Sequence, residues 1–394
     1  MRRPRGAESS PKTSVDILIV GGGVTGCALA YYLARGGGEV LLIERDDLNS
    51  GGSGASAGSL HLQLPAPFFT QTPRDRLLRA AAALIPLSVA AAAEWRRLIQ
   101  ELRGDIEFHI GGGLMVAETD GQMALLEDKV KLERSCGLET EVLRGDDIHE
   151  VAPYLSPRII GAAFCPTEGK VNPLAATIAL AEAAVEAGGC IRRDVELRRL
   201  DARGATFVAE TSAGAVQSRL VVDAAGSSAG RIAAMVGAEL PVTARPQNLI
   251  VTEAAPAKIS HLVQHIGRRL TLKQASNGKF LIGGGLPAQR APAGGVAVMR
   301  NSLETGLATA ISVVPMIGGL RLLRSWAGEA LITDGNPILG EHPSVTGFHY
   351  AVPSSSGYTT GPISARLLAE VLLGDRPSDD LRHFSIARFS DPDV

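Results

Sequence analysis

Three glycines near the start of the chain have the spacing that binds the phosphates of a dinucleotide. Gly21, Gly23 and Gly26 form the pattern Gly-x-Gly-x-x-Gly. The first glycine of such a pattern permits a tight turn, the second lets a pyrophosphate approach the backbone, and the third lets a helix pack closely on a strand. Glu44 follows within about 20 residues, where an acid accepts hydrogen bonds from ribose hydroxyls. Chance matches are common in a chain with 45 glycines, so the pattern needs support from its surroundings.

The elements around these glycines supply that support. The apolar run 15–20 predicts a buried parallel strand, 24–35 predicts a helix, and 40–43 predicts a second strand that stops at Glu44. The phosphates would then lie at the N-terminus of the helix, where free N–H groups and the helix dipole favour negative charge. We therefore predict a dinucleotide-binding β–α–β unit and reject a plain turn.

Two later segments favour FAD over NAD as the dinucleotide. Residues 222–226 (VDAAG) form the strand-to-turn segment typical of flavoproteins with two dinucleotide folds. Residues 356–361 (SGYTTG) open a helix, whose positive end would face anionic reduced flavin. Residues 51–59 (GGSGASAGS) are either a plain linker or a segment whose backbone approaches the ligand.

Composition excludes several classes of protein. The net charge of −2 argues against a general nucleic-acid binder. The four cysteines form no Cys-x-x-Cys pair and the histidines have no ligand spacing, so we predict no metal site. The apolar stretch 80–93 has about 14 residues, whereas a bilayer span needs about 20. The basic N-terminus lacks the apolar segment of a signal peptide. We expect a cytoplasmic protein with a flexible leader over 1–13.

Strands and helices alternate at both ends of the chain, and a β-rich section interrupts the middle. This order predicts a mixed α/β protein of two interleaved domains. We assign an FAD-binding Rossmann domain to 14–75, 155–235 and 325–394, and an antiparallel β-sheet substrate domain to 76–154 and 236–324. Further helices are expected at 75–103, 121–136, 172–187, 302–315 and 362–373.

With these segments in view, the chain resembles a known family, the D-amino-acid oxidase superfamily of FAD oxidoreductases (glycine oxidase, sarcosine oxidase and relatives), from about residue 15 to 389. The resemblance is carried by VDILIVGGGVTGCALAYYLAR, GASAGSLH, EGKVNPLAATIALAEAA, VVDAAG, RSWAGEALITDGNPILG and SGYTTGPISARLLAEVL. Three segments look most like the catalytic subunits of opine oxidases, with hydrogen cyanide synthase and hydroxyproline dehydrogenases as near relatives: GGLMVAET, LTLKQASNGKFLIGGG and RSWAG.

The resemblance implies a glutathione-reductase-like FAD domain roofed by an antiparallel sheet. It also implies oxidation of a CH–N bond by hydride transfer to the flavin, followed by hydrolysis of the imine. The residues that it places against FAD are the pyrophosphate turn Gly21, Gly22, Gly23, Val24, Thr25 and Gly26; Glu44 and Arg45 at the ribose; Ser53, Gly54, Ala55, Ser56, Ala57, Gly58, Ser59 and Leu60 along the flavin; Val195 at the adenine through its backbone; Ala225 and Gly226 beside the nucleotide; and Gly328, Asp334, Gly357, Tyr358, Thr359 and Thr360 around the isoalloxazine ring.

Three departures from the family pattern matter. Ala330 stands where glycine-oxidase-like members place an Arg that binds the substrate carboxylate. Ala327 stands near the Cys that attaches FAD in sarcosine-oxidase-like members, so the resemblance implies non-covalent FAD. Leu281 falls where those oxidases carry a lysine that assists oxygen reduction, and Lys279 is two residues away. The last departure favours a dehydrogenase over an oxidase.

Five side chains are candidates for the chemistry, each with a plainer alternative. His61 could handle a proton or could be a structural histidine. Lys273, next to Gln274 on a strand of the roof, could bind a carboxylate or could be solvated. Trp326 could line the pocket or only pack, and Tyr358 could bind substrate or only support its turn. Glu329 could recognise a cationic substrate or could be a surface glutamate.

These observations leave several functions open. The leading hypothesis is an FAD-dependent dehydrogenase or oxidase for an amino acid or secondary amine, such as an opine or hydroxyproline. It would be the catalytic subunit of a hetero-oligomer, in which a second flavin or iron–sulfur subunit receives the electrons. The alternatives are a self-sufficient glycine- or sarcosine-type oxidase that produces hydrogen peroxide, a catalytically silent flavin-binding subunit, and a hydroxy-acid oxidase of the same fold.

Overall fold

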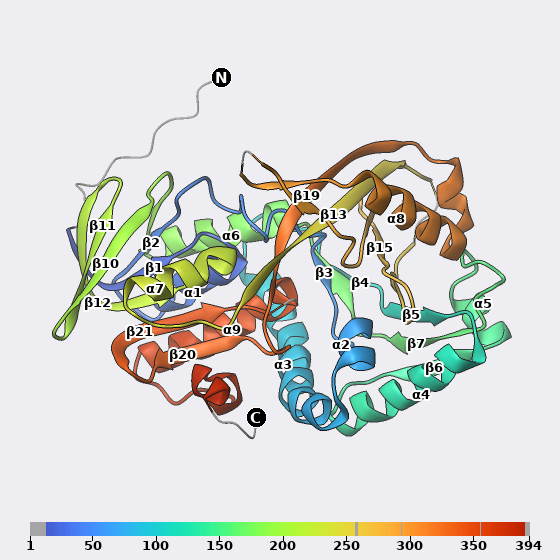
Figure 1. The fold of residues 1–394 in the computed structure, drawn as a ribbon, viewed down its shortest axis with the longest axis horizontal. Coiled ribbons are helices and arrows are strands. Elements are labelled where there is room, and N and C mark those ends of the chain that lie inside the picture. Colours follow the sequence, from blue (N-terminus) through green and yellow to red (C-terminus); the bar gives the residue numbers. More distant parts are fainter. Residues whose placement is uncertain (1–12, 257–258, 293, 355, 391–394) are drawn as a thin grey trace.

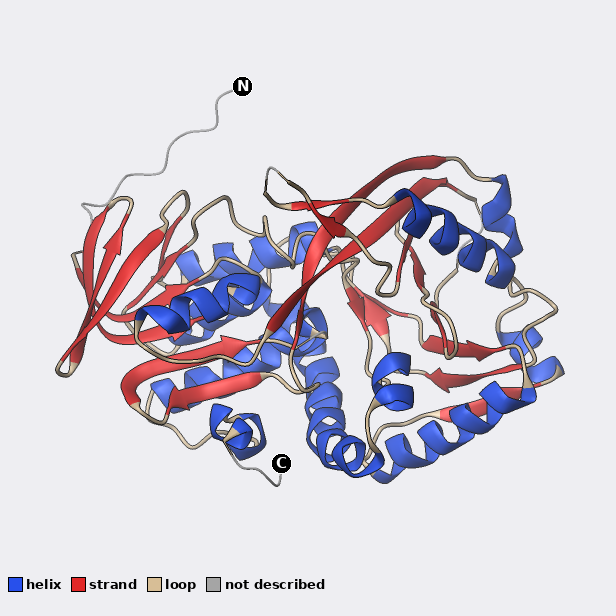
Figure 2. Ribbon diagram, viewed as in Figure 1, coloured by secondary structure: helices blue, strands red, loops and turns tan. Residues whose placement is uncertain are grey.

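The computed structural model describes residues 13–256, 259–292, 294–354 and 356–390, so the predicted leader lies outside the described residues except for Thr13. Two sheets form the cores of two lobes (Figures 1 and 2). Helices pack around and between these sheets. The mixed α/β architecture that the sequence predicts is confirmed.

The first sheet holds the predicted β–α–β unit at its centre. β1 (Ser14–Val20) pairs in parallel with β2 (Val40–Ile43) on one side and with β12 (Gly214–Asp223) on the other. The second half of β12 pairs in parallel with β21 (Val345–Val352). The remaining strands of this sheet are β9 (Cys190–Arg192), β10 (Leu197–Arg203), β11 (Thr206–Thr211) and β20 (Ile338–His342).

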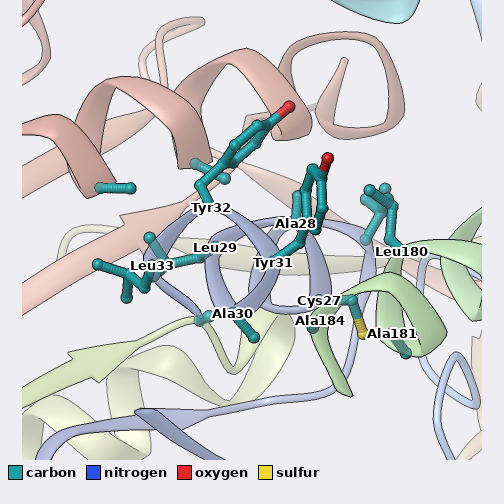
Figure 3. Packing of buried hydrophobic residues seen from close by; sticks show 14 of the residues in the cluster. Cys27, Ala28, Leu29, Ala30, Tyr31, Tyr32, Leu33, Leu180, Ala181 and Ala184 are labelled. Carbon is teal, nitrogen blue, oxygen red and sulfur yellow. The ribbon is translucent and has the colours of Figure 1, made fainter. Parts of the chain in front are cut away.

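Helices from distant parts of the sequence cover this sheet. α1 (Val24–Arg35), α6 (Pro173–Glu186) and α9 (Gly357–Leu372) share one apolar cluster. Eleven of the twelve residues of α1 are buried, because small side chains such as Cys27 let α6 approach closely near Ala181 and Ala184 (Figure 3). α7 (Ala229–Met235) packs with the apolar cluster on the other face.

The second sheet is the predicted roof, but it is mixed and not purely antiparallel, because Leu262–His265 pairs in parallel with Gly113–Ala117. Its order is β19, β13, β16, β15, β14, β5, β7, β6. α8 (Arg300–Val313) covers one face, where Ala310 and Val313 share a cluster with Ile250 and Ile282. The bounds are β5 (Gly113–Ala117), β6 (Glu141–Arg144), β7 (Gly161–Cys165), β13 (Thr243–Ala254), β14 (Leu262–His265), β15 (Thr271–Gln274), β16 (Lys279–Gly283) and β19 (Leu322–Ile332).

β13 and β19 are the longest strands and run side by side toward the first lobe (Figure 1). They pair in antiparallel register from Thr243 opposite Ile332 to Thr252 opposite Leu322. Two short sheets complete the fold: β3 (Ser59–Leu60), β8 (Gly169–Lys170) and β4 (His109–Ile110) form one. The hairpin of β17 (Gln289–Arg290) and β18 (Val296–Ala297) forms the other.

The observed sheets divide the chain differently from the predicted domain bounds. β7 pairs within the roof, although 155–235 was assigned to the FAD-binding domain. α3 (Arg74–Glu101) packs on α9 of the first lobe, although 76–154 was assigned to the substrate domain. The other helices are α2 (Ala66–Gln71), α4 (Asp120–Ser135) and α5 (Asp146–Val151), with short 3-10 turns at 226–228, 315–319, 382–384 and 386–389.

α3 matches the helix expected at 75–103 and extends beyond the apolar stretch 80–93 at both ends. Its 28 residues make it, by length and composition, a helix that could cross a membrane. However, 61% of its most apolar window is buried inside the fold, as in the core helix of many globular proteins. The predicted cytoplasmic location rested on the shorter stretch and stays a prediction.

Candidate functional site

The glycine turn between β1 and α1 has no room for side chains. Gly21 has a φ of +119°, and a Cβ there would lie 2.5 Å from the carbonyl oxygen of Ala224. A Cβ on Gly26 would lie 2.0 Å from the carbonyl oxygen of Gly21. The turn therefore packs directly against the end of β12, where Ala225 and Gly226 follow, as a dinucleotide site requires.

The predicted ribose acid lies beside this turn. One carboxylate oxygen of Glu44 accepts a hydrogen bond from the Gly22 N–H at 2.7 Å, and the other accepts one from the Asp46 N–H at 3.0 Å. The N–H of Val195 donates to the Glu44 carbonyl at 2.8 Å, so a backbone contact with adenine would fall to the Val195 carbonyl. Arg45 reaches Ser228 in the 3-10 turn after β12.

The small-residue segment after β2 covers the N-terminus of α1. Ser53 Oγ accepts the N–H of Val24 at 3.0 Å. Gly58 has a φ of +68° and its carbonyl accepts the N–H of Val171, which fixes the start of β3. The segment is therefore held against the glycine turn, and the interpretation as a plain linker is wrong.

The first turn of α9 meets α1 at the same place. A Cβ on Gly361 would lie 2.8 Å from Thr25 Oγ1, a buried atom that has no hydrogen-bond partner among the described residues. Tyr358, Thr359 and Thr360 are buried in this turn. Two helix N-termini thus converge on one site, and both favour negative charge.

These features fit FAD. The glycine turn, the N-terminus of α1 and Thr25 would hold the pyrophosphate, Glu44 the ribose, and residues 53–60 with the start of α9 the flavin. When bound, FAD supplies the acceptor for a hydride from carbon.

Cys27, the cysteine on α1, is fully buried. Burial disfavours its thiolate and so raises its pKa, and the negative charge of Glu44 adds to this effect.

The roof presents one face to this site, and strand register shows which side chains it carries. Ile250, Ile282 and Leu272 belong to the cluster under α8. Neighbouring residues on a strand point to opposite faces, and directly paired residues share a face. Lys273, Leu281 and Val251 are paired across β15, β16 and β13, so they lie on the face away from α8.

Contacts with the FAD segment confirm that this face looks toward the site. Lys273 Nζ donates to the carbonyl of Val171, which is hydrogen-bonded to Gly58, at 2.9 Å. Gln264, on the same face of β14, contacts His61 at 3.0 Å. Lys273 is 4% exposed, so the alternative of a solvated lysine is wrong. Burial lowers the pKa of Lys273 to about 7, and nearby Lys170 adds to this effect.

Lys170 on β8 completes this basic cluster but is fully engaged. Its ammonium donates to the carbonyls of Ile259, Ser260 and Gln274. Burial lowers the pKa of Lys170 to about 8. Lys273 therefore has the greater freedom to respond to a bound anion, because one acceptor among the described residues contacts its ammonium.

His61 is held by a buried network. The Gln264 amide nitrogen contacts Nδ1 of His61 at 3.0 Å. Glu168 Oε2 is 3.7 Å from Nδ1, and Glu168 Oε1 accepts the N–H groups of Leu62 and Gln63. Burial acts to raise the pKa of Glu168, but His61 and these N–H groups outweigh it and lower the pKa.

Sequence reasoning missed Glu168 and Gln264 as partners of His61. Glu168 lies in the segment EGKVNP, but a single acid carries no signal of its own. Gln264 becomes visible only through the pairing of β14 with β15. Behind them, Gln63, Lys129 and Glu133 continue the buried network to α4.

Other predicted residues are already engaged within the protein. The Tyr358 hydroxyl donates to the Pro173 carbonyl and contacts Thr177, and its ring stacks on Trp95 at 5.8 Å. Its hydroxyl thus points into the α6 core, which favours the supporting role. Asp334 pairs with Arg388 through two 2.8 Å contacts, which hold the C-terminal segment, and its place beside the flavin ring stays a prediction.

Trp326 and Glu329 lie on opposite faces of β19. Trp326 Nε1 donates to the Ala55 carbonyl at 3.0 Å, and a Cβ on Gly328 would lie 2.4 Å from Ala55 Cβ, so this face meets the FAD segment. Glu329 points to the other face and pairs with Arg290 of the β17–β18 hairpin at 2.7 Å. A substrate cation would have to compete with this arginine. No group of three metal-binding side chains comes together within the described ranges.

Comparisons with known proteins identify the family. The family model for FAD-dependent oxidoreductases of the DAO type matches residues 16–371. Glycine oxidase of Geobacillus kaustophilus (strain HTA426) is 30% identical over 390 residues, which cover 95% of this chain and 97% of that protein. One of the opine oxidase subunits of Rhizobium meliloti is 28% identical, with coverage of 95% and 98%.

Solved structures lead to the same fold. The crystal structure of glycine oxidase from Geobacillus kaustophilus superposes with a TM-score of 0.83 at 28% identity, covering 96% of this chain and 99% of that one. L-proline dehydrogenase from P. horikoshii superposes with a TM-score of 0.84 at 21% identity, covering 96% and 99%, and supports the fold alone. The resemblance read from the sequence is thereby confirmed.

Proposed function

This chain belongs to the DAO family of FAD-dependent oxidoreductases and oxidises CH–N bonds of amino acids or amines, and we propose that its substrate is an opine, proline, hydroxyproline or similar secondary amine. We propose further that FAD is bound without a covalent bond and that the electrons pass to a second protein subunit. That subunit would carry a flavin or an iron–sulfur cluster.

The side chain at position 281 supports a protein partner over oxygen as the electron acceptor. Leu281 lies on the face of the roof that looks toward the FAD segment, and it offers no charge to a reduced oxygen species. The 28% identity with an opine oxidase subunit over nearly the full length of both chains supports a role within a larger complex. The four cysteines are widely spaced, so an iron–sulfur cluster would belong to the partner.

The chain's own residues would position the substrate and exclude water. Gln264 and Glu168 both contact the Nδ1 side of the His61 ring, which leaves the Nε2 side to face a substrate. Trp326 closes the site against Ala55. Such positioning supplies much of the rate of a hydride transfer, because the reacting C–H bond must point at its acceptor.

A second candidate is a self-sufficient oxidase that produces hydrogen peroxide. Lys273 favours it, because this buried lysine lies directly opposite Leu281 on the paired strand and on the same face. A cation there could stabilise negative charge as electrons pass to oxygen. Similarity to glycine oxidase is consistent with this candidate.

One experiment separates these functions. The purified holoprotein is mixed without oxygen with octopine, nopaline, hydroxyproline, proline, sarcosine or glycine, and the visible flavin band is followed. Bleaching by one secondary amine and slow recovery in air support the dehydrogenase subunit. Fast recovery with one peroxide per turnover identifies the oxidase. Failure of all six compounds to bleach the flavin contradicts the proposed substrate class.

The attachment of FAD is tested on the same sample. We expect acid or heat to release all of the flavin into the supernatant, because no cysteine lies near Ala327 or after Cys190. Flavin that stays with the precipitated chain would contradict non-covalent binding.

A further inference from the structure

The face of β13 and β19 that meets the FAD segment carries an arginine that has no acceptor among the described residues. Arg245 is paired with Ala330, two positions beyond the pair of Gln247 and Gly328. Paired residues share a face, and alternate residues return to it. Arg245 and Ala330 therefore lie on the same face as Gly328, whose Cβ would touch Ala55.

The other cations near this face each have a contact among the described residues. Lys273 is buried and donates to the Val171 carbonyl. The Arg324 guanidinium lies 4.8 Å from the centre of the Trp326 ring. Arg290 lies on the opposite face and pairs with Glu329. Within the described ranges, the Arg245 side chain is exposed and meets no acceptor.

The residue opposite Arg245 leaves space for a ligand. The Cβ atoms of directly paired residues are about 5 Å apart, and Ala330 ends at its Cβ. The guanidinium of Arg245 can thus extend along β19 toward Gly328 without meeting another side chain from position 330. An arginine offers two parallel N–H donors, which match the two oxygens of a carboxylate.

We propose that Arg245 binds the carboxylate of the substrate and so makes the enzyme specific for amino acids over simple amines. The proposal rests on the proposed CH–N oxidation. Glu329 and Arg290 then have a different task, because their ion pair holds the β17–β18 hairpin against the outer face of β19.

The test compares Arg245→Ala with Arg290→Ala as the matched control. Both arginines are exposed, but Arg290 lies on the outer face. The dissociation constants of acetate and benzoate are measured from the shift of the bound flavin spectrum. We expect Arg245→Ala to weaken both ligands about 10- to 100-fold, the range lost with a charge-assisted hydrogen bond, and Arg290→Ala to leave them within about twofold.

Substrate kinetics provide the second measurement. For the compound that bleaches the flavin, we expect Arg245→Ala to raise the half-saturating concentration by a similar factor and to change the limiting rate less. The corresponding amine without a carboxylate should be oxidised at equal rates by the wild type and by Arg245→Ala. Arg245→Lys should recover part of the loss. Arg245→Ala combined with Ala330→Arg should recover most of it, because position 330 is directly opposite.

The outcomes are distinguishable. The proposal is overturned if Arg245→Ala binds carboxylates as tightly as the wild type does. It is also overturned if carboxylates do not change the flavin spectrum of the wild type. If carboxylates bind through Arg245 but no amine bleaches the flavin, the proposal stands and the proposed function fails. FAD content and the unfolding temperature of each variant show whether a loss reflects misfolding, and Ala330→Arg recovery excludes that explanation.

Discussion

The most unusual single residue is Asp223, at the end of β12 beside the nucleotide turn. It is fully buried; Oδ1 accepts the Ala225 N–H, while Oδ2 has no partner among the described residues. Burial raises the pKa of Asp223 to about 8, although the Ala225 N–H acts against this. The folded protein therefore prefers the protonated acid at neutral pH.

This preference makes stability depend on pH. A carboxyl whose pKa is raised on folding makes its full contribution to the free energy of unfolding below its unfolded pKa near 4. That contribution is lost as the pH rises to about 8. We expect the wild type to lose up to about 1.4 kcal/mol per pH unit across this window from Asp223. Asp223→Asn keeps the acceptor and should remove this dependence. Urea unfolding at pH 5 to 8 with saturating FAD measures it; equal slopes in both proteins would contradict it.

Lys273 gives a prediction for the reaction with oxygen. Its pKa of about 7 means that the ammonium loses its proton as pH rises through neutrality. If a cation there assists electron transfer to oxygen, reoxidation of the reduced flavin should slow between pH 6 and 8 in the wild type. In Lys273→Met, reoxidation of the reduced flavin should be about tenfold slower than in the wild type at pH 6, and its rate should not depend on pH.

Lys279→Met is the control for this prediction. Lys279 is also a lysine and lies two residues from Leu281 on β16, but the residue paired with Leu281 is Lys273. Stopped-flow mixing of reduced protein with aerated buffer gives the rates. Equal rates for Lys273→Met and the wild type would remove Lys273 from the oxygen reaction and leave the dehydrogenase as the better explanation.

At this scale the sequence predicted what local spacing determines. The glycine turn and Glu44 follow from a short β–α–β unit, so their positions could be foreseen. The directions of Lys273, Glu329 and Arg245 depend on strand register between segments far apart in the chain, and no local pattern contains that register. Tyr358 faces α6 for the same reason.

At the scale of elements, α9 shows how a distant partner moves a boundary. The sequence predicts a Ser/Gly turn and then a helix that begins at Pro362. The helix begins at Gly357, with Pro362 inside it. Proline cannot donate to the carbonyl four residues earlier, that of Tyr358. Trp95 Nε1 of α3 donates to this carbonyl at 3.3 Å and to that of Thr359 at 3.2 Å.

A double-mutant cycle tests this substitution of one donor for another. Trp95→Phe removes the N–H but keeps a ring to stack on Tyr358, and should cost about 1–3 kcal/mol because buried carbonyls lose their donor. Pro362→Ala restores a backbone N–H to the Tyr358 carbonyl. In that background Trp95→Phe should cost measurably less, by denaturant unfolding. Additive costs would show that the indole N–H is not compensating for the proline.

The remaining elements were predicted well where periodicity is strong. α4 and α8 differ from their expected bounds by one or two residues at each end. α3 was expected at nearly its observed length, but its place on the first lobe was not, because an apolar face does not show which sheet it will cover.

At the scale of the whole molecule, the two lobes meet where β19 touches the FAD segment. The contact between Gly328 and Ala55 leaves no space for a methyl group, since an added Cβ would lie 2.4 Å from Ala55 Cβ. The prediction of a roof over the flavin follows from the family resemblance. The closeness of this contact is a property of how the lobes pack, and sequence reasoning did not provide it.

Gly328→Ala tests the importance of this junction. The methyl group should push residues 53–60 away from β19, at a cost of about 1–3 kcal/mol for overpacking. We expect about tenfold weaker FAD binding, by titration of flavin fluorescence into apoprotein. Gly121→Ala is the control, because a Cβ there meets nothing within 4 Å. Equal FAD affinity in both variants would mean that this contact does not hold the cofactor segment.

The cross-strand register of the roof has a consequence for comparing relatives. Ala330 and Leu281 stand at two positions where the resemblance implies basic residues in glycine- or sarcosine-oxidase-like members, and each faces a basic residue on the paired strand, Arg245 and Lys273. A charge can therefore change strands while staying in nearly the same place in space. Aligning such enzymes one column at a time would count two lost basic residues, whereas counting the charge of each facing pair would count none.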